Sequence, residues 1–230
     1  MESALEKYFS LIRSKPSIFA NENAPLKIIT DLDTILAWQK EKRVELQQKG
    51  LPLEWAEIGV VIDDPYVLLI RDLVEFPDAT KNGYIRFVNR ADFSGGQGVV
   101  VMACVNDRIL LLRQFRHATR SWHLEVPRGY GEPGVSAAKQ AADELQEEIG
   151  ATIGKLESLG VMHNNSSFEG QPVHLFFAQL NSIGKPSHQE GIERFILVTL
   201  SELESFIRDG KITDGFTIAA YARAKLAGLI

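Results

Sequence analysis

The stretch from Gly129 to Ala151 reads GYGEPGVSAAKQAADELQEEIGA and carries the strongest structural signal in the chain. It begins as a loop rich in glycine and proline. Apolar residues then recur at helical spacing, at Ala138, Ala141, Ala142, Leu145 and Ile149. They form one stripe along a predicted helix, and the small alanine side chains in it allow a close approach to a neighbour. The pattern therefore predicts a helix that packs against a β-sheet.

Acidic residues crowd the end of this predicted helix. Glu144 and Glu148 are one turn apart, and Glu147 lies between them on the same side, at the border of the apolar stripe. With Asp143 they place four carboxylates where the helix dipole is negative, so the charges repel one another and the dipole. Two interpretations are open. Water and salt screen an exposed face, or Mg²⁺ or Mn²⁺ is bound, because such ions take carboxylate oxygens and bridge to phosphates.

The rest of the chain alternates between β-type runs and helical segments. Runs of branched and aromatic residues predict strands at 58–62, 66–76, 83–89, 98–104, 108–113, 122–126, 155–162, 173–180 and 195–200. Asn106 and Asp107 predict a tight turn between two of these strands. Helices are expected at 201–208 and 214–226. This order predicts an α/β fold with a mixed sheet and helices on both faces.

Residues 1–55 have a helical rather than a β-type pattern of apolar residues. They are predicted to form an N-terminal helical extension, followed by one domain over 56–230. Apolar residues at helical spacing begin at Leu5, and Pro16 ends that segment. A second helix is predicted over 33–49, with Asp33 as its N-cap.

Composition excludes several classes of protein. The 230 residues are 45% hydrophobic and 24% charged, which is ordinary for a globular chain. The net charge of -5 argues against nonspecific nucleic-acid binding, which needs a basic surface. The single cysteine, Cys104, excludes an intrachain disulfide and is expected to be a core residue rather than a nucleophile. No apolar run approaches the ~18 residues of a membrane span, and no basic, apolar leader opens the sequence. A cytoplasmic protein without a membrane partner is expected.

The spacing of Gly129 and of 144–151 resembles the Nudix box, which is Gly, five residues, Glu, seven residues, then Arg-Glu-apolar-any-Glu-Glu-any-Gly-apolar. The upstream runs RQFR (113–116) and WHLEVPRG (122–129) are similar to those of ADP-ribose pyrophosphatases in the Nudix superfamily. The resemblance covers about residues 60–226. It implies a Nudix α/β/α sandwich that uses Mg²⁺ or Mn²⁺ to hydrolyse a nucleoside diphosphate linked to another group. ADP-ribose or an ADP-sugar is the first candidate, with AMP and a sugar phosphate as products.

The same resemblance assigns roles to residues. It implies that Glu144, Glu147 and Glu148 hold the metal, together with the backbone carbonyl of Arg128. Two positions depart from the box, because Val135 stands where the family has glutamate and Asp143 where it has arginine. In the family these two residues are thought to pair and brace the loop and helix. Here both are replaced, so the brace is lost as a unit, which is easier to tolerate than one orphaned charge.

The catalytic base is the third departure. The family carries a glutamate in a loop before a strand like 174–178, and this chain has Gln171 at that position. An amide cannot act as a general base. Glu169 stands two residues earlier, beside Phe168, which matches an aromatic residue of the family's loop. Glu169 is therefore either the base or an ordinary exposed loop acid.

Arg113 and Arg116 are predicted to point to one face of a strand, where their guanidinium groups would suit phosphates. Surface ion pairs are the alternative. The resemblance also implies a homodimer built through residues 58–89. A second hypothesis is a weakly active or inactive Nudix-fold module that binds such a nucleotide for regulation. Val135, Asp143 and Gln171 favour that hypothesis, and the three intact glutamates oppose it.

Overall fold

The computed structural model describes residues 2–230, which form two compact units. The first unit contains the described residues up to Phe93 and the loop Asn165–Gly170. The second unit contains Ser94–Asn164 and Gln171–Ile230. The boundary predicted between residues 55 and 56 lies inside the first unit. The division of the chain into an extension over 1–55 and a domain over 56–230 stays a prediction.

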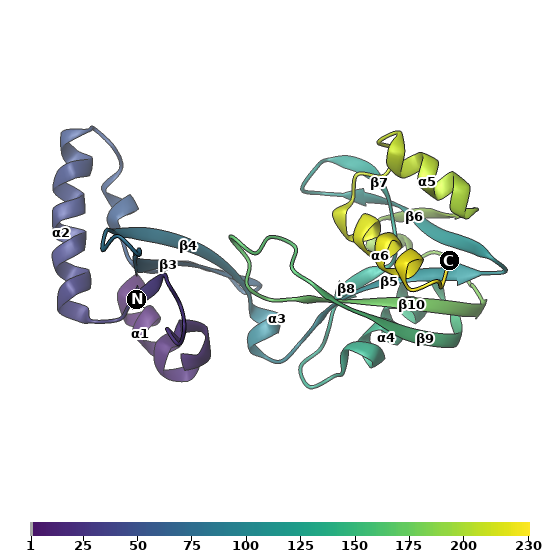
Figure 1. Cartoon of the computed structure of the whole chain (residues 1–230), viewed down its shortest axis with the longest axis horizontal. Helices are drawn as coiled ribbons and strands as arrows, with labels where there is room; N and C mark the ends of the chain where they lie inside the picture. The colour runs from purple at the N-terminus through teal and green to yellow at the C-terminus, as the bar shows by residue number, and fades with distance from the viewer. Residues whose placement is uncertain (1) are drawn as a thin grey trace. The chain divides into compact units, whose positions relative to one another are not determined.

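The second unit is built on a seven-stranded mixed sheet (Figure 1). Its main path runs β11 (Ile192–Val198), β6 (Arg108–Arg116), β5 (Gly98–Val105), β10 (Val173–Ser182) and β9 (Thr152–Met162). Two short strands, β7 (Ser121–Glu125) and β8 (Arg128–Tyr130), pair with β6 and β5. Strand β10 is parallel to β5, and the other pairs are antiparallel. Asn106 and Asp107 both have positive φ, as the predicted two-residue turn requires.

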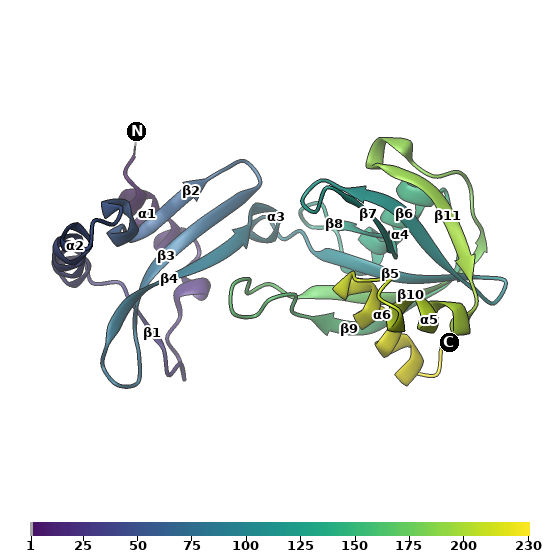
Figure 2. The ribbon, with the colours of Figure 1, turned by 90° about the horizontal axis from the view of Figure 1, so that it is seen from above.

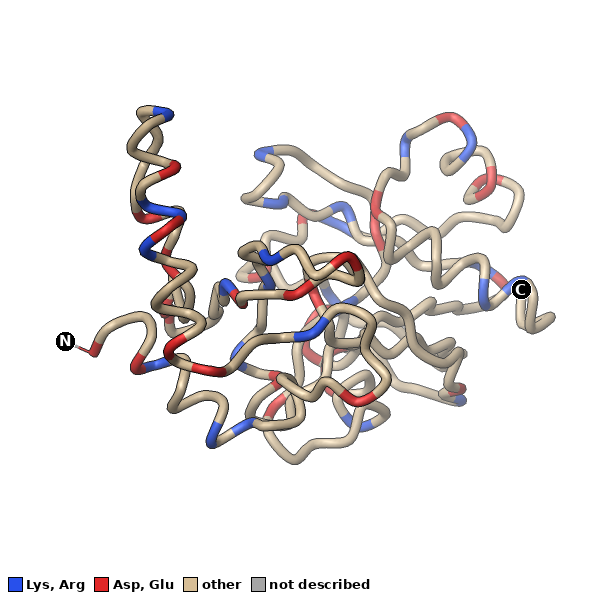
Figure 3. The backbone as a smooth tube through the Cα atoms, turned by 60° about the vertical axis from the view of Figure 1, so that its left-hand side comes forward, with Lys and Arg blue, Asp and Glu red and all other residues tan. Residues whose placement is uncertain are grey.

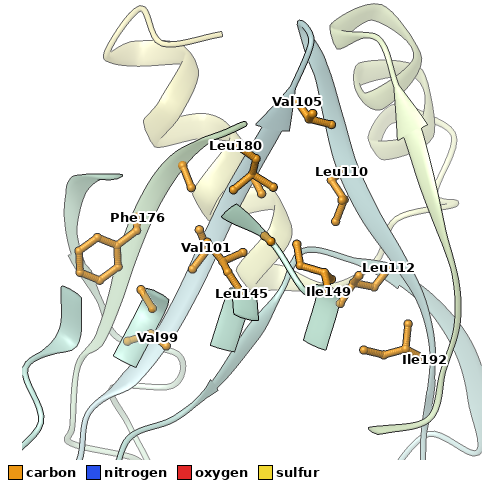
Figure 4. Packing of buried hydrophobic residues seen from close by; sticks show 14 of the residues in the cluster. Val99, Val101, Val105, Leu110, Leu112, Leu145, Ile149, Phe176, Leu180 and Ile192 are labelled. Carbon is orange, nitrogen blue, oxygen red and sulfur yellow. The ribbon is translucent and has the colours of Figure 1, made fainter. Parts of the chain in front are cut away.

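Strand β5 is buried along its whole length because both of its faces are covered. Val99, Val101 and the other odd-numbered residues pack against α4 (Ala137–Ile149), as Figure 4 shows. Val100, Met102 and Cys104 point to the other face, toward α5 (Leu200–Arg208) and α6 (Gly215–Leu226). Figures 1 and 2 show α4 and α6 on opposite sides of this sheet. The predicted α/β/α sandwich is confirmed, and Cys104 is a buried core residue.

The first unit has a small sheet of its own. Strand β3 (Val67–Glu75) is the common partner in this sheet. It pairs antiparallel with β1 (Lys27–Ile29), β2 (Gly59–Asp63) and β4 (Lys81–Asn89). The helical elements of this unit are α1 (Ala4–Ser14), η1 (Pro16–Phe19), α2 (Leu32–Gln48), η2 (Leu53–Ala56) and α3 (Arg90–Phe93). Basic and acidic residues are mixed along the upright helix at the left of Figure 3, which is α2. Among residues 2–230, no helix has both the length and the apolar character needed to cross a bilayer.

The predicted N-cap of α2 was wrong by two residues. Asp31, rather than Asp33, precedes the helix, and its carboxylate accepts from the backbone N–H of Thr34 at 2.9 Å and from its hydroxyl at 2.6 Å. Asp33 lies in the first turn instead. An N-cap needs an extended backbone and a donor three residues later, and Asp31 meets both conditions.

A buried carboxylate joins the helices of the first unit to its sheet. Asp72 on β3 is 1% exposed and accepts a 2.6 Å bond from the hydroxyl of Tyr8 on α1. Arg86 on β4 binds the same carboxylate through Nε at 2.5 Å and Nη2 at 3.0 Å. Burial raises the pKa of Tyr8, so its hydroxyl stays protonated and keeps donating.

Tyr8→Phe should therefore lower the free energy of unfolding by about 1.5–3 kcal/mol, the range for a hydrogen bond to a charged group. Urea unfolding followed by tryptophan fluorescence measures the change, since Trp38 and Trp55 belong to this unit. Tyr66→Phe is the matched control, because Tyr66 is 79% exposed and its change should stay within about 0.5 kcal/mol. Equal losses in the two variants would contradict the role given to the Tyr8–Asp72 bond.

Candidate active site

Helix α4 carries the acidic residues of the site, and its ends are set by local sequence. Ser136 caps the N-terminus by accepting from the N–H of Lys139 at 3.3 Å. Gly150 ends the helix in the left-handed conformation that glycine adopts without strain. Because Leu145 and Ile149 are fully buried against β5, the neighbouring Glu148 is drawn inward to 4% exposure. Glu144 is half-buried and Glu147 is exposed.

The backbone at Arg128 and Gly129 lies against the carboxylates of both Glu148 and Glu144. Strand β8 pairs with β5, which holds it beside α4. From this strand the N–H of Arg128 donates to Oε2 of Glu148 at 3.2 Å. A Cβ added at Gly129 would overlap the carboxylate of Glu144 as it lies here, so the glycine lets the backbone lie directly against that side chain. The first glycine of the box therefore contacts a glutamate of the same box.

Burial and mutual repulsion make the charged state of these carboxylates costly. Burial, and next the charge of Glu144, raise the pKa of Glu148 to about 8. Burial also raises the pKa of Glu144, against the opposing effect of a hydrogen bond from Gln140. Like charges held together out of water favour either a bound proton or a bound cation.

The donor set fits a hard divalent cation. Among residues 2–230, no three His, Cys, Asp or Glu side chains already form a complete metal cage. Mg²⁺ does not require one, since it commonly takes one or two carboxylates and keeps several waters. Glu144 and Glu148 supply such oxygens beside the backbone of Arg128. The metal roles of Glu147 and of the Arg128 carbonyl stay predictions.

A buried ion network, which we call the Glu125 network, flanks the glutamate pair. Glu125 is fully buried and binds Arg116 through two bonds, Nε–Oε1 at 2.9 Å and Nη2–Oε2 at 2.7 Å. Arg128 contacts the same carboxylate at 2.7 Å and Asp214 at 3.0 Å. Asp214 also caps α6 by accepting from Thr217. Neither Glu125 nor Asp214 was predicted from the sequence to belong to the site, although Glu125 lies within the run WHLEVPRG (122–129).

The expectation that Arg113 and Arg116 share one face was wrong. Side chains alternate along a strand, and residues three apart point to opposite faces. The side chain of Arg116 lies on the same face as that of Glu125, to which it is bonded. Arg113 lies over the ring of Trp122, 4.4 Å from its centroid, and pairs with Glu193. The proposed role of either arginine in phosphate binding stays a prediction.

A cavity of about 230 Å³ lies against the Glu125 network within the second unit. Its polar wall includes Arg116 and Arg128, and Tyr130, Val173 and Phe216 line much of the rest. The guanidinium of Arg128 lies 4.8 Å from the ring centroid of Phe216. An apolar hollow with cationic groups at its wall suits part of a ligand that carries both a ring and phosphates.

The candidate base lies in the loop that belongs to the first unit. Phe168 stacks on Phe87 with ring centroids 5.9 Å apart, and its carbonyl accepts from the N–H of Phe87 at 2.8 Å. Glu169 follows, and its charge adds to burial in raising the pKa of Asp92 to about 6. Gln171 belongs to the second unit and comes two residues before β10. The roles of Phe168, Glu169 and Gln171 stay predictions.

The burial of Glu148 predicts how stability depends on pH without metal. Its pKa is about 8 in the folded chain against 4.5 for an ordinary glutamate, so between these values the folded state holds a proton that the unfolded state has lost. The free energy of unfolding in EDTA should therefore fall as the pH rises from 5 to 8, by on the order of a few kcal/mol. Urea unfolding across this range should show a clearly weaker fall in Glu148→Gln. The exposed Glu147→Gln is the control and should keep the wild-type slope. Identical slopes in all three proteins would refute this assignment.

Comparison with known proteins places this geometry in a family. The sequence model of the NUDIX domain matches residues 95–216. The ADP-ribose pyrophosphatase of Bacillus subtilis is 27% identical over 182 residues, which cover 77% of this chain and 91% of that protein. The ADP compounds hydrolase NudE of Escherichia coli is 28% identical over 98 residues, 43% of this chain and 53% of that one.

A solved structure shows the same fold. The crystal structure of an ADP compounds hydrolase superposes with a TM-score of 0.65 at 20% identity, covering 75% of this chain and 93% of the other. The matched family domain contains Gly129, Glu144 and Glu148. The chain therefore belongs to the Nudix family and is a Nudix-type pyrophosphohydrolase related to these two kinds of hydrolase.

Proposed function

We propose that this protein hydrolyses the pyrophosphate bond of a nucleoside diphosphate linked to a sugar, with ADP-ribose or an ADP-sugar as the substrate. The products would be AMP and a sugar phosphate. The observation that carries the proposal is the pair of carboxylates of the buried Glu148 and the half-buried Glu144, which lie against the backbone of Arg128 and Gly129. The names of the relatives, an ADP-ribose pyrophosphatase and an ADP compounds hydrolase, support the substrate class.

Glu144 and Glu148 are the proposed holders of Mg²⁺ or Mn²⁺, with Glu147 and the carbonyl of Arg128 completing the set. When bound, the metal supplies neutralisation of the pyrophosphate charge and activation of a water. The chain itself supplies position. Arg116 and Arg128 line the cavity and suit the phosphates of the substrate, whereas Tyr130 and Phe216 suit a ring.

Glu169 is the proposed general base, and Phe168 and Gln171 are proposed substrate contacts. We also propose that the protein works as a cytoplasmic homodimer that pairs through residues 58–89. A nucleotide sugar is then its only expected partner apart from the second copy. Neither a nucleic acid nor a membrane is needed for this function.

A panel of nucleotide sugars tests the function. With Mg²⁺, chromatography should show AMP from ADP-ribose or an ADP-sugar, and excess EDTA should stop its release. Glu148→Gln should lower kcat by at least ~10²-fold, the scale for losing transition-state charge stabilisation. Asp143→Asn is the control, because Asp143 pairs with Lys139 on the outer side of α4 and should be nearly silent. Wild-type rates in Glu148→Gln, or release of inorganic pyrophosphate from nucleoside triphosphates as the main reaction, would overturn the proposal.

Two variants test the base. Glu169→Gln should lower kcat with little change in KM, because a base acts mainly in the transition state. Gln171→Glu should change kcat only modestly. A silent Glu169→Gln variant in an active enzyme would refute this role. A gain of ~10²–10⁴-fold from Gln171→Glu, starting from a negligible rate, would instead indicate a binding protein that has lost its base.

A further inference from the structure

Gln140 is a buried polar residue on α4, and the sequence alone predicted no role for it. It lies one helical turn before Glu144 and is 6% exposed. A buried amide is costly unless its hydrogen-bonding groups are satisfied. The contacts of Gln140 therefore explain why this position of the helix is not simply apolar.

The side chain of Gln140 joins the loop to the helix. Its Nε2 donates to Oε1 of Glu144 at 2.8 Å and to the carbonyl of Tyr130 at 3.4 Å. Its Oε1 accepts from the N–H of Glu132 at 3.3 Å. One amide thus binds two loop residues and the half-buried carboxylate of Glu144 at once.

The loop passes close to the side chain of Gln140 at Gly131. A side chain at Gly131 would meet Cγ of Gln140 at 3.1 Å and the backbone of Gln97 at the same distance. The N–H of Gly131 also donates to the carbonyl of Gln97 at 3.0 Å. The loop at Gly131 therefore lies close against Gln140 on one side and against Gln97, the residue before β5, on the other.

The positions where the Nudix box has its own brace do not do this work here. Val135 is aliphatic and cannot form an ion pair. Asp143 pairs with Lys139 on its own helix. Gln140, by contrast, connects residues on both sides of the loop–helix junction.

We propose that Gln140 is a positioning residue that braces the loop against α4 and orients Glu144 for a divalent cation. The inference rests on the proposed metal role of Glu144. A neutral amide suits this task, because a lysine or arginine in its place would cancel the charge of the carboxylate that the cation needs. The amide fixes Oε1 of Glu144 through a hydrogen bond and adds no charge of its own.

Direct binding of Mn²⁺ by the full-length protein without substrate, measured by electron paramagnetic resonance, tests the proposal. Gln140→Met keeps the length of the side chain and removes its bonds, and it should weaken Mn²⁺ binding by about 10–100-fold, the usual effect of losing a partner of a metal ligand. Gln39→Met is the matched control, because Gln39 is also buried and its Oε1 accepts from Ile58 at 2.7 Å. It should lower the unfolding midpoint and leave Mn²⁺ affinity unchanged. Wild-type affinity in Gln140→Met would overturn the proposal.

A double-mutant cycle and a measurement on the wild-type protein complete the test. Because Gln140 acts through Glu144, Gln140→Met should add little to the loss of affinity in Glu144→Gln. The side-chain amide resonances of Gln140 should shift on titration with Mg²⁺ and stay still in Glu144→Gln, which needs no Gln140 variant to fold. Additive losses, or resonances that do not move although Mg²⁺ binds, would refute the positioning role. A wild-type protein that binds neither ion would instead refute the proposed function.

Discussion

The packing of α4 on β5 is the contact on which the rest of the second unit depends. Ala141, Leu145 and Ile149 are fully buried against a strand that is itself covered on both faces. Alanine at position 141 brings the helix close, and that closeness decides how deep the residues flanking the stripe must lie. Glu148 follows Leu145 by three residues and is buried with it. The hydrophobic contact is thus what removes a carboxylate from water.

Neutral N–H groups hold both carboxylates that this packing buries. Glu148 receives a bond from the backbone of Arg128, and Glu144 receives one from Gln140. Such donors fix the orientation of a carboxylate and leave its charge available. The Glu125 network follows a different rule, because there a fully buried carboxylate is matched by two guanidinium groups. Removing one partner of such a network leaves a buried charge without compensation, which costs far more than an exposed pair.

The Glu125 network also forms part of the cavity wall. Arg116 and Arg128 are paired with carboxylates there, so their guanidinium groups are held in fixed positions. Asp214 connects this wall to the start of α6, and Thr217 donates to Asp214 and accepts from the N–H of Val126. Preorganised groups of this kind need little reorganisation during a reaction, which is the main source of electrostatic catalysis.

The sequence by itself determined the class of fold and singled out the glutamates of the candidate site. Helical spacing over 138–149 predicted α4, the turn at Asn106 and Asp107 was correct, and the box singled out Glu144 and Glu148. These features are local, since periodicity and turn chemistry are written into neighbouring residues. The error at Asp33 was local too, because two aspartates stood within reach of the same helix start and only backbone conformation distinguishes them.

Only the tertiary structure decided which partners each side chain has. Glu125 contacts Arg128 and, through it, Asp214, which is 86 residues away from Arg128 in the chain. Arg113 and Arg116 separate because a strand alternates its faces, and Gln140 acquires a role because a loop folds back over it. Contacts between distant segments arise from the packing of sheet and helices, and no spacing within one segment encodes them.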